Sequence, residues 1–517
     1  MNADEQKFKD CVKLFEAGNY NGSLDYALQL ESALPENKEV LLMLVRNYYF
    51  LNDFVKAEIY LKKLIASASR DSGYYSLLAQ IQKHLGKIPE AEENYMKSIN
   101  LQPLSPDTFY NLGILYSETA NYEKAALCFC KSISLDKNFY KAYYNYGNVL
   151  RKLKEYKKAA EAYRNAIRIK PDYEDALYNL GVVSENDLDF KEAEESYKKV
   201  LQMNPGNLHA KWNFALINLL NGNYKEGLEN YECRLQKPEF KRKPKAPENW
   251  KGEPLAGKKI LVYCEQGFGD SIQFIRFLKY LRKPDVFIGL ETREELLELF
   301  AYIEGIDELA GRNDSLKNNY DYECSLLSLP FLLQSDEKDF AVSEPYLNIP
   351  ANKEIEEKVN AISGFKIGIV WRGNPSHIRD EERSVDISLF SGLKEAEGVS
   401  LISLQKGVDE KLIQKDFEVL QIPQIGNDFL EIAQIIKKID LVITVDTAIA
   451  HLAGAICAPV WTLIPAYPDW RWGISGDKTI WYPSMKLFRQ NKRGCWQEVF
   501  KKINEELLII KNQRGVI

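Results

Sequence analysis

The sequence has few of the features that would place it in a specialised class of protein. Its eight cysteines are scattered and form no C-x-x-C pair, which argues against a structural zinc site or a disulfide framework. No apolar run reaches the roughly 18 residues of a membrane span, and MNADEQKFKD at the start lacks the pattern of a secretory signal. A net charge of -6 without blocks of one sign gives no reason to expect nucleic acid as a partner. We therefore expect free thiols in a reducing, cytoplasmic protein without a transmembrane segment.

A 34-residue repeat fills the N-terminal part of the chain. Four ladders share this step: Ala79, Gly113, Gly147, Gly181 and Ala215; Ala57, Ala91, Ala125, Ala159, Ala193 and Gly227; Tyr95, Phe129, Tyr163, Tyr197 and Tyr231; Pro103, Pro171 and Pro205. Small residues let the two helices of a hairpin approach, the aromatic residues are expected to fill the space between neighbouring hairpins, and proline ends a unit because it cannot continue a helix. The pattern resembles the tetratricopeptide repeat and predicts about seven helical hairpins in a superhelix over residues 1–240.

Such a superhelix has a concave groove, which we expect to bind a protein or peptide; a scaffold or dimerisation surface is the alternative. Tyrosine or tryptophan followed by asparagine recurs on the first helix of each unit, at Tyr110 and Asn111, Tyr144 and Asn145, Tyr178 and Asn179, and Trp212 and Asn213. These asparagines either hydrogen-bond an extended peptide or stabilise the turn between units.

The pattern changes after the basic, proline-rich linker FKRKPKAPENWKGEPL (240–255). Short apolar segments now alternate with helical ones, which is typical of parallel sheets covered by helices. Strands are predicted at 260–265, 285–291 and 324–329, then at 366–371, 399–405, 441–446 and 458–465, with a last helix at 496–510. We predict an N-terminal lobe at 241–350 and a C-terminal lobe at 351–517, with ligands bound between the carboxyl ends of their sheets.

Several of these strand ends carry residues that could bind a ligand or take part in catalysis. In CEQGFGDSIQ (264–273), Gly267 and Gly269 either form a plain turn or clear space for a ligand, and Asp270 is either a helix-start residue or a base. In VDTAIAHLAGA (445–455), Asp446 and Thr447 can cap a helix whose free N–H groups bind an anion.

A third group of residues suits phosphate. Arg372, Arg379 and Arg383 lie in a loop after a predicted strand, and Lys406 follows another. Guanidinium groups bind diphosphates through two points, although a solvated charged loop is the alternative. Phosphate binding together with a general base fits transfer of a group from an activated phosphate ester.

The order of six segments resembles that of the bacterial tetratricopeptide-repeat glycosyltransferases: GFGDSIQFIRF, IVWRGNPSHIRDEERS, LISLQKG, VDTAIAHLAGA, PDWRWG and WYPSMKLFRQ. Their catalytic half is related to the ADP-heptose:lipopolysaccharide heptosyltransferases, and their architecture is similar to that of O-GlcNAc transferase. The resemblance implies a GT-B fold of two Rossmann-like lobes and a metal-independent, usually inverting reaction. Lipopolysaccharide heptosyltransferases lack repeats, so the donor sugar stays open.

The resemblance also implies roles for individual residues. Asp270 would be the catalytic base, with His451 as the other candidate; His451 is otherwise a core residue. The residues implied to bind the donor are Arg372, Asn374, Gln405, Lys406, Asp446, Thr447, Ala448 and His451. The cleft would also contain Gln266, Gly267, Gly269, Arg383, Trp470 and Arg471. Trp470 and Trp472 either stack on a base or sugar or simply pack in the protein.

The function that the sequence predicts is transfer of a sugar from a nucleotide-sugar donor to a protein hydroxyl, with the repeats holding the acceptor and no metal or other cofactor. Flagellin or another surface protein is the expected acceptor by analogy alone. One alternative is a non-catalytic scaffold with a nucleotide-binding half. Another is a transferase for lipopolysaccharide or lipid-linked sugar, which predicts a membrane-facing patch such as the short run FKRKPK (240–245). The oligomeric state stays open, a homo-oligomer included.

Overall fold

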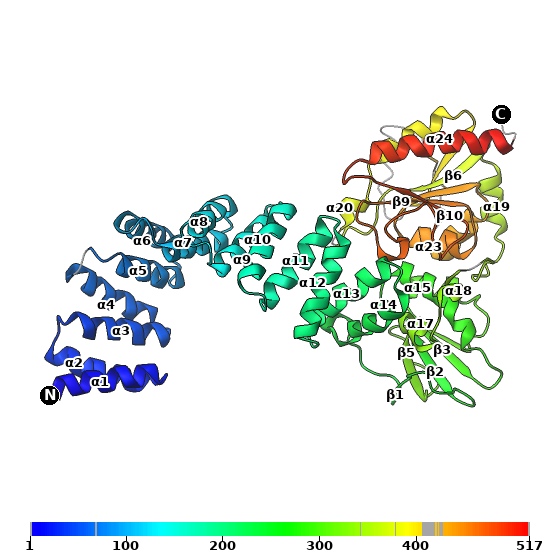
Figure 1. Ribbon diagram of the computed structural model, residues 1–517. Helices are drawn as coiled ribbons and strands as arrows, with labels where there is room; N and C mark the ends of the chain where they lie inside the picture. Colours follow the sequence, from blue (N-terminus) through cyan, green and yellow to red (C-terminus); the bar gives the residue numbers. More distant parts are fainter. Residues whose placement is uncertain are drawn as a thin grey trace. The chain divides into compact units, whose positions relative to one another are not determined.

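The computed structural model describes residues 3–67, 70–341, 343–377, 379–405, 419–420, 422 and 428–514. The chain divides into two compact units, Met1–Met203 and Asn204–Ile517. Figure 1 shows the first unit as a series of helices and the second as helices and strands.

The first unit is all-helical, as the repeat pattern predicts. Within its described residues, consecutive helices pair into six antiparallel hairpins. The helices are α1 (Ala3–Glu16), α2 (Tyr20–Ala33), α3 (Lys38–Phe50), α4 (Phe54–Ser67), α5 (Ser72–His84), α6 (Ile88–Leu101), α7 (Pro106–Glu118), α8 (Tyr122–Leu135), α9 (Tyr140–Lys152), α10 (Tyr156–Ile169), α11 (Glu174–Asn186) and α12 (Phe190–Met203). The seventh hairpin, α13 (Leu208–Leu220) and α14 (Tyr224–Tyr231), belongs to the second unit.

The glycine and aromatic ladders meet inside each hairpin. A Cβ atom on Gly147 would lie 2.6 Å from the ring of Tyr163, and one on Gly181 would lie 2.5 Å from the ring of Tyr197. Both rings are fully buried. Each ring therefore covers the glycine of its own hairpin, because that glycine leaves the space. Tyr163 also shares a buried cluster with Ala176 and Leu180 of the next hairpin, which agrees with the expected place between hairpins.

The turns inside the hairpins follow a further ladder. Seven residues at the 34-residue step have a positive φ angle and end the first helix of each unit: Gly18, Asn52, Gly86, Ala120, Lys154, Leu188 and Gly222. A left-handed residue at this place caps the carbonyl groups at the end of a helix, and glycine adopts it without strain.

The second unit contains two sheets, which confirms the predicted all-α array followed by two parallel α/β lobes. The first sheet has the order β1-β5-β2-β3-β4, and all its pairings are parallel. Its lobe comprises β1 (Glu248–Asn249), β2 (Lys259–Tyr263), α15 (Phe268–Phe274), η3 (Ile275–Tyr280), β3 (Phe287–Thr292), η4 (Glu294–Leu296), α16 (Leu297–Phe300), β4 (Glu308–Gly311), β5 (Tyr322–Ser325), η5 (Leu326–Ser328), α17 (Leu329–Leu332) and α18 (Glu337–Phe340).

The second sheet has the order β10-β9-β8-β6-β7 and is also parallel throughout. Its lobe comprises α19 (Lys353–Asn360), β6 (Phe365–Val370), α20 (Asp380–Arg383), η6 (Ile387–Glu395), β7 (Val399–Ser403), α22 (Phe429–Ile436), β8 (Leu441–Val445), α23 (Ala448–Ala455), β9 (Val460–Ile464), η7 (Trp470–Trp472), β10 (Met485–Arg489) and α24 (Trp496–Arg514).

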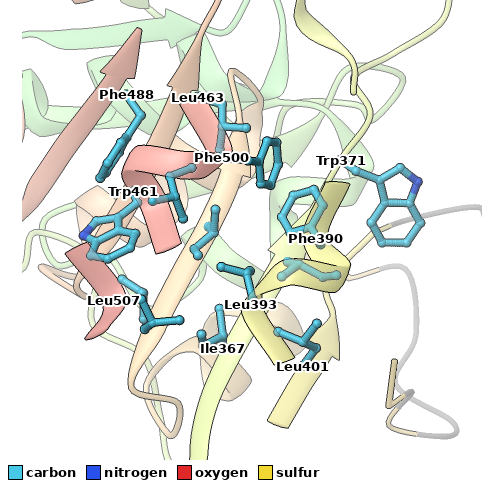
Figure 2. Close-up of a cluster of buried hydrophobic side chains, with 14 of the residues drawn as sticks. Ile367, Trp371, Phe390, Leu393, Leu401, Trp461, Leu463, Phe488, Phe500 and Leu507 are labelled. Atoms are coloured by element: carbon cyan, nitrogen blue, oxygen red, sulfur yellow. The ribbon is translucent and has the colours of Figure 1, made fainter. Parts of the chain in front are cut away.

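The core of the C-terminal lobe explains why the last helix packs back on the sheet. The apolar side of α24, including Phe500 and Leu507, lies against buried residues of the strands, including Leu463 from β9 and Ile367 from β6. Figure 2 shows these side chains converging with Phe390 of η6.

The seventh hairpin is attached to the N-terminal lobe by a buried arginine. The side chain of Arg234, which follows α14, has no exposed surface. Its guanidinium group donates to the carboxylates of Glu232 and Glu265, and to the hydroxyl groups of Ser325 and Ser328. The hairpin is therefore bonded to residues near the carboxyl ends of β2 and β5.

Candidate functional site

The predicted site residues lie at the two places where the strand order reverses. In the N-terminal sheet this place is between β2 and β5, and the loop leaving β2 leads to Asp270. In the C-terminal sheet it is between β6 and β8, which are followed by Arg372 and Asp446. Ligands of open parallel sheets bind beside the carboxyl ends of the strands at such points. The helices that follow, α15 and α23, pack on one another.

Asp270 carries out the helix-start role that the sequence left open. It is the third residue of α15, and its Oδ2 accepts a hydrogen bond from the backbone N–H of Gly267 at 2.9 Å. Its other oxygen, Oδ1, accepts from the Nη2 of Arg471 in the opposite lobe. The side chain is 19% exposed, and each carboxylate oxygen has a second lone pair. The carboxylate is thus held in one orientation and can still be reached by a hydroxyl group.

Arg471 is the residue that connects the two lobes at this point. Its guanidinium group also donates to Gln273 Oε1 at 2.5 Å and to Asp469 Oδ1 at 2.8 Å. Burial alone would lower its pKa, but the carboxylates of Asp469 and Asp270 outweigh that effect and raise the pKa of Arg471. The sequence analysis did not identify Asp469 or Gln273. The only signal for Asp469 was its place in PDWRWG, two residues before the arginine.

Gly269 clears space for a side chain of the protein. A Cβ atom there would lie 2.7 Å from His451 Cδ2 and 3.5 Å from Ala448 Cα. The two lobes therefore approach closely where Gly269 meets α23, and the alternative that this glycine makes room for a ligand is not needed to explain it.

His451 is a buried residue of this contact. It is 5% exposed, its Nδ1 lies 3.0 Å from the hydroxyl group of Tyr482, and its ring stacks on Trp472. Burial, together with the positive charges of Arg471 and Arg276, holds its pKa well below the usual range. His451 is therefore neutral near pH 7. This arrangement matches the core alternative.

Trp470 and Trp472 are also buried, which favours packing over stacking on a ligand. Trp470 is 5% exposed and meets Trp481 edge to face. The guanidinium carbon of Arg471 lies 4.4 Å from the centroid of the Trp470 ring.

The start of α23 has the form expected of an anion site. Thr447 is the N-cap residue, and its hydroxyl oxygen accepts from the N–H of Ile449. Asp446 precedes it, half-buried. Burial raises the pKa of Asp446 to about 6, and the negative charge of Asp469 adds to this, while Arg383 opposes it.

The raised pKa of Asp446 has a consequence for stability. Its ordinary value is 3.8, so the folded protein binds the proton more tightly, and the free energy of unfolding of the second unit falls as the pH rises from about 4 to about 6. At pH 8, we expect the free energy of unfolding of Asp446→Asn to be about 1–2 kcal/mol higher than that of the parent. The difference should shrink to a few tenths of a kcal/mol near pH 4, where the folded state of the parent is protonated and the unfolded state is only about half ionised. Urea unfolding at the two pH values checks this; an equal difference at both would contradict it.

Two of the predicted phosphate-binding residues contact other protein groups. Arg383 donates from Nε to Asp380 Oδ1 at 3.0 Å and from Nη1 to the backbone oxygen of Asp446 at 3.2 Å. Gln405 accepts the backbone N–H groups of Trp371 and Arg372 with one oxygen. Gln405 therefore shapes the loop after β6.

Arg372 and Asn374 lie on the surface of this loop. Arg372 is exposed, and in the described part of the chain its guanidinium group makes no hydrogen bond or ion pair. Asn374 is also exposed and accepts the N–H of Ser376. Lys406 lies outside the described residues.

Gln266 connects the Asp270 turn to the seventh hairpin. Its side-chain amide lies 2.9 Å (Nε2) and 3.2 Å (Oε1) from the hydroxyl oxygen of Tyr231 on α14. Gln266 therefore has a structural partner in the protein.

The recurring tyrosines and asparagines of the first unit bond to one another. The side-chain nitrogen of Asn145 donates to the hydroxyl of Tyr110 in the preceding repeat, and Asn179 donates in the same way to Tyr144. The first helices of neighbouring units also touch, α7 on α9 and α9 on α11. These asparagines thus connect successive units through side chains, rather than through the turn.

No group of three or more histidine, cysteine, aspartate or glutamate side chains that could hold a metal ion occurs within the described ranges. In the same part of the chain, every helix is too short or too polar to cross a membrane.

Comparison with solved structures finds similarity to repeat proteins. MamA is 25% identical with a TM-score of 0.30, over 31% of this chain and 93% of that one. The C-terminal part of a TPR repeat-containing protein from Cytophaga hutchinsonii is 18% identical with a TM-score of 0.40, over 46% of this chain and 96% of that one.

Comparison with sequences and family models extends to the second unit. Protein FlbA of Caulobacter vibrioides is 24% identical over 286 residues, which is 49% of this chain and 47% of FlbA, so the chain spans about half the length of this curated relative. Tetratricopeptide repeat models match residues 14–81, 72–103, 94–126, 147–186 and 174–207. The model described as glycosyltransferase family 9 (heptosyltransferase) matches residues 379–500. The chain therefore combines tetratricopeptide repeats with a family 9 (heptosyltransferase) glycosyltransferase domain.

Proposed function

We propose that this chain is a metal-independent, inverting glycosyltransferase of the GT-B type, which moves a sugar from a nucleotide-sugar donor to a protein hydroxyl group. The observation that carries the proposal is the family 9 match over residues 379–500, which includes β8, α23 and η7. Asp446, Thr447, His451 and Arg471 all fall in this segment. Asp270 lies outside it, and its role is supported by its contact with Arg471 across the lobes.

The chemistry is one displacement at the anomeric carbon. The acceptor oxygen bonds to this carbon while its proton passes to Asp270. The bond from the carbon to the donor phosphate breaks, and its electron pair leaves with the nucleoside diphosphate. The N–H groups at the start of α23 and the guanidinium group of Arg372 stabilise that negative charge. Lys406 is proposed to assist them.

Between the two candidate bases, exposure favours Asp270. A base must come within hydrogen-bond reach of the proton that it removes. Asp270 is 19% exposed, whereas His451 is 5% exposed and occupied by Tyr482 and Trp472. We therefore assign the proton transfer to Asp270.

A protein acceptor is supported by the repeats, since solenoids of this kind bind extended partners along the concave side. A surface protein such as flagellin is the acceptor to test first. A lipid-linked acceptor is less well supported, because the basic run near residue 240 is partly neutralised: Glu291 pairs with both Arg242 and Lys245.

Donor binding tests the proposal directly. The full chain would be melted with UDP-, GDP-, ADP-, dTDP- and CMP-sugars and the matching nucleotides, in the presence of EDTA. A ligand that binds only the folded state at 100 times its Kd adds about 2.7 kcal/mol of stability. We expect one nucleotide to raise Tm without added metal, and Arg372→Gln to weaken its binding about 10-fold, as the loss of one charged hydrogen bond predicts.

Arg46→Gln, which removes an exposed arginine of the first unit, should leave the nucleotide shift unchanged. If no nucleotide shifts Tm, the proposed transferase is wrong. If a shift occurs only after divalent metal is added, the metal-independent mechanism is wrong.

A further inference from the structure

Two arginines leave the N-terminal sheet side by side, beside the Asp270 turn. Arg293 directly follows β3 and Arg312 directly follows β4. The strands are parallel neighbours, and their last paired residues are Thr292 and Gly311. Both arginines therefore start from the carboxyl edge of the sheet, where ligands of parallel sheets bind.

Neither arginine has a carboxylate partner in the described part of the chain. Arg312 donates from Nη2 to the backbone oxygen of Cys264 at 2.6 Å. The guanidinium carbon of Arg293 lies 4.9 Å from the centroid of the Phe268 ring, and its Nε is buried with no hydrogen-bond partner. A buried donor without a partner is costly, and such a group calls for an explanation.

Several other basic residues near this edge of the sheet have carboxylate partners. Arg242 and Lys245 both contact the carboxylate of Glu291, and Arg234 contacts Glu232 and Glu265. Arg293 and Arg312 therefore differ from Arg234 and Arg242, which have carboxylate partners.

The two guanidinium groups also repel one another. The pKa of Arg312 is lowered, first by burial and second by the positive charge of Arg293. The negative charges of Glu291 and Glu294 offset part of this effect. Glu291 is already engaged by Arg242 and Lys245, and the side chain of Glu294 is exposed. Two like charges held together without an ion pair leave an excess of positive charge at the edge of the sheet.

The contacts of these arginines place the charge beside the proposed base. Cys264, whose oxygen binds Arg312, directly follows β2, and Phe268, which lies under Arg293, is the first residue of α15. Asp270 is two residues further along the same helix. An anionic group held between the arginines would therefore belong to a molecule lying against the N-terminal lobe near Asp270.

We propose that Arg293 and Arg312 form an anion subsite, which binds a carboxylate or phosphate group of the acceptor and so selects an acidic acceptor. The acceptor role rests on the proposed function; binding of the anion does not. Paired guanidinium groups suit this task because each offers several N–H donors in a fixed plane that matches carboxylate and phosphate oxygens.

The test uses the full chain and two probes, inorganic phosphate and acetate, each compared with chloride at equal ionic strength. Binding is measured by calorimetry and by the shift in Tm. The variants are Arg293→Gln and Arg312→Gln, with Arg282→Gln as the matched control, a partly exposed arginine of the same lobe that pairs with Glu304. We expect phosphate affinity to fall at least 10-fold in the first two variants and to persist in the third. Nucleoside diphosphate binding should persist in all three variants. The stronger of the two probes identifies the anionic group as phosphate or carboxylate.

A structural role would give a different result. Since the side chain of Arg293 makes no hydrogen bond to the described residues, its replacement is expected to leave the ligand-free Tm within about 2 °C, consistent with a small change at a partly exposed site. A large fall in Tm with unchanged phosphate affinity would overturn the subsite. So would equal phosphate affinity in all variants, while nucleoside diphosphate binding would still support the transferase. Conversely, the chain could bind no nucleotide but still lose phosphate binding when Arg293 or Arg312 is replaced. That result would support the anion subsite and reject the proposed reaction.

Discussion

An Asp270→Asn enzyme is expected to bind its nucleotide-sugar donor normally and to transfer sugar about 10²- to 10⁴-fold more slowly, the range in which general bases contribute to catalysis. The amide can still accept the N–H of Gly267, so the start of α15 is retained. It cannot take the proton of the acceptor, and it gives up the ion pair with Arg471. The measurement is kcat in a transfer assay beside the Kd of the donor.

The chain offers a matched control for the helix-start role of Asp270. Asp339 is the third residue of α18 in the same lobe, and its carboxylate accepts the N–H of Asp336 in the same capping arrangement. It has no arginine partner among the described residues. Asp339→Asn should therefore reproduce the loss of the helix-start carboxylate but leave kcat unchanged. Near-normal turnover of Asp270→Asn would contradict the assignment of Asp270 as the base and leave His451 as the remaining candidate.

Arg234→Met is expected to destabilise the second unit by about 3–5 kcal/mol, which is the cost of removing one member of a buried ion pair. The substitution removes the bonds to four side chains and leaves the carboxylate of Glu265, which is almost fully buried, without its cation. The seventh hairpin would then lose its strongest polar attachment to the N-terminal lobe.

Tryptophan fluorescence can follow this loss without interference from the repeats. All eight tryptophans, from Trp212 to Trp496, lie in the second unit. The change in tryptophan fluorescence with urea therefore reports unfolding of the second unit alone, whereas both units contribute to the far-UV circular dichroism signal. Arg242→Met is the control: its side chain is 21% exposed and contacts Glu291 and Glu323, so about 1 kcal/mol or less is expected. Equal effects of the two substitutions would refute the anchoring role of Arg234.

The elements that could be predicted from the sequence are those with a strong, local pattern. The 34-residue step identified the hairpins because each unit repeats the same packing problem. The strands with four or more apolar residues were found, whereas β1, β4 and β10 were missed. β1 has two exposed residues, and β4 reads only ELAG. The predicted strand at 324–329 ends at Ser325, because the leucines that follow turn into η5.

The residues with a positive φ angle at the end of each first helix show a sequence pattern that is only partly visible. Gly18, Gly86 and Gly222 fall on the 34-residue step, but Asn52 and Leu188 occupy equivalent positions with the same positive φ. The packing of each hairpin imposes the left-handed turn even where the side chain disfavours it. A search for glycine alone finds only part of such a ladder.

The site illustrates what a linear pattern cannot contain. The roles of Gly269 and Asp270 depend on His451 and Arg471, about 180 to 200 residues further along the chain. A strand end followed by GFGD is compatible with a ligand, a base or a helix start, and only the approach of α23 decides between a ligand and a side chain. Arg293 and Arg312 were missed for the same reason, since their proximity arises from the pairing of β3 with β4.

The grouping of the seventh hairpin with the transferase lobes has a consequence for how such chains vary. Because α13 and α14 are bonded to the N-terminal lobe through Arg234 and Tyr231, we expect that a whole repeat of 34 residues before residue 204 can be added or removed without breaking these bonds. Engineered chains with one repeat more or one fewer should therefore keep the fold of the second unit. Turnover of a small acceptor should be indifferent to the length of the array, while the choice among large acceptors should follow it.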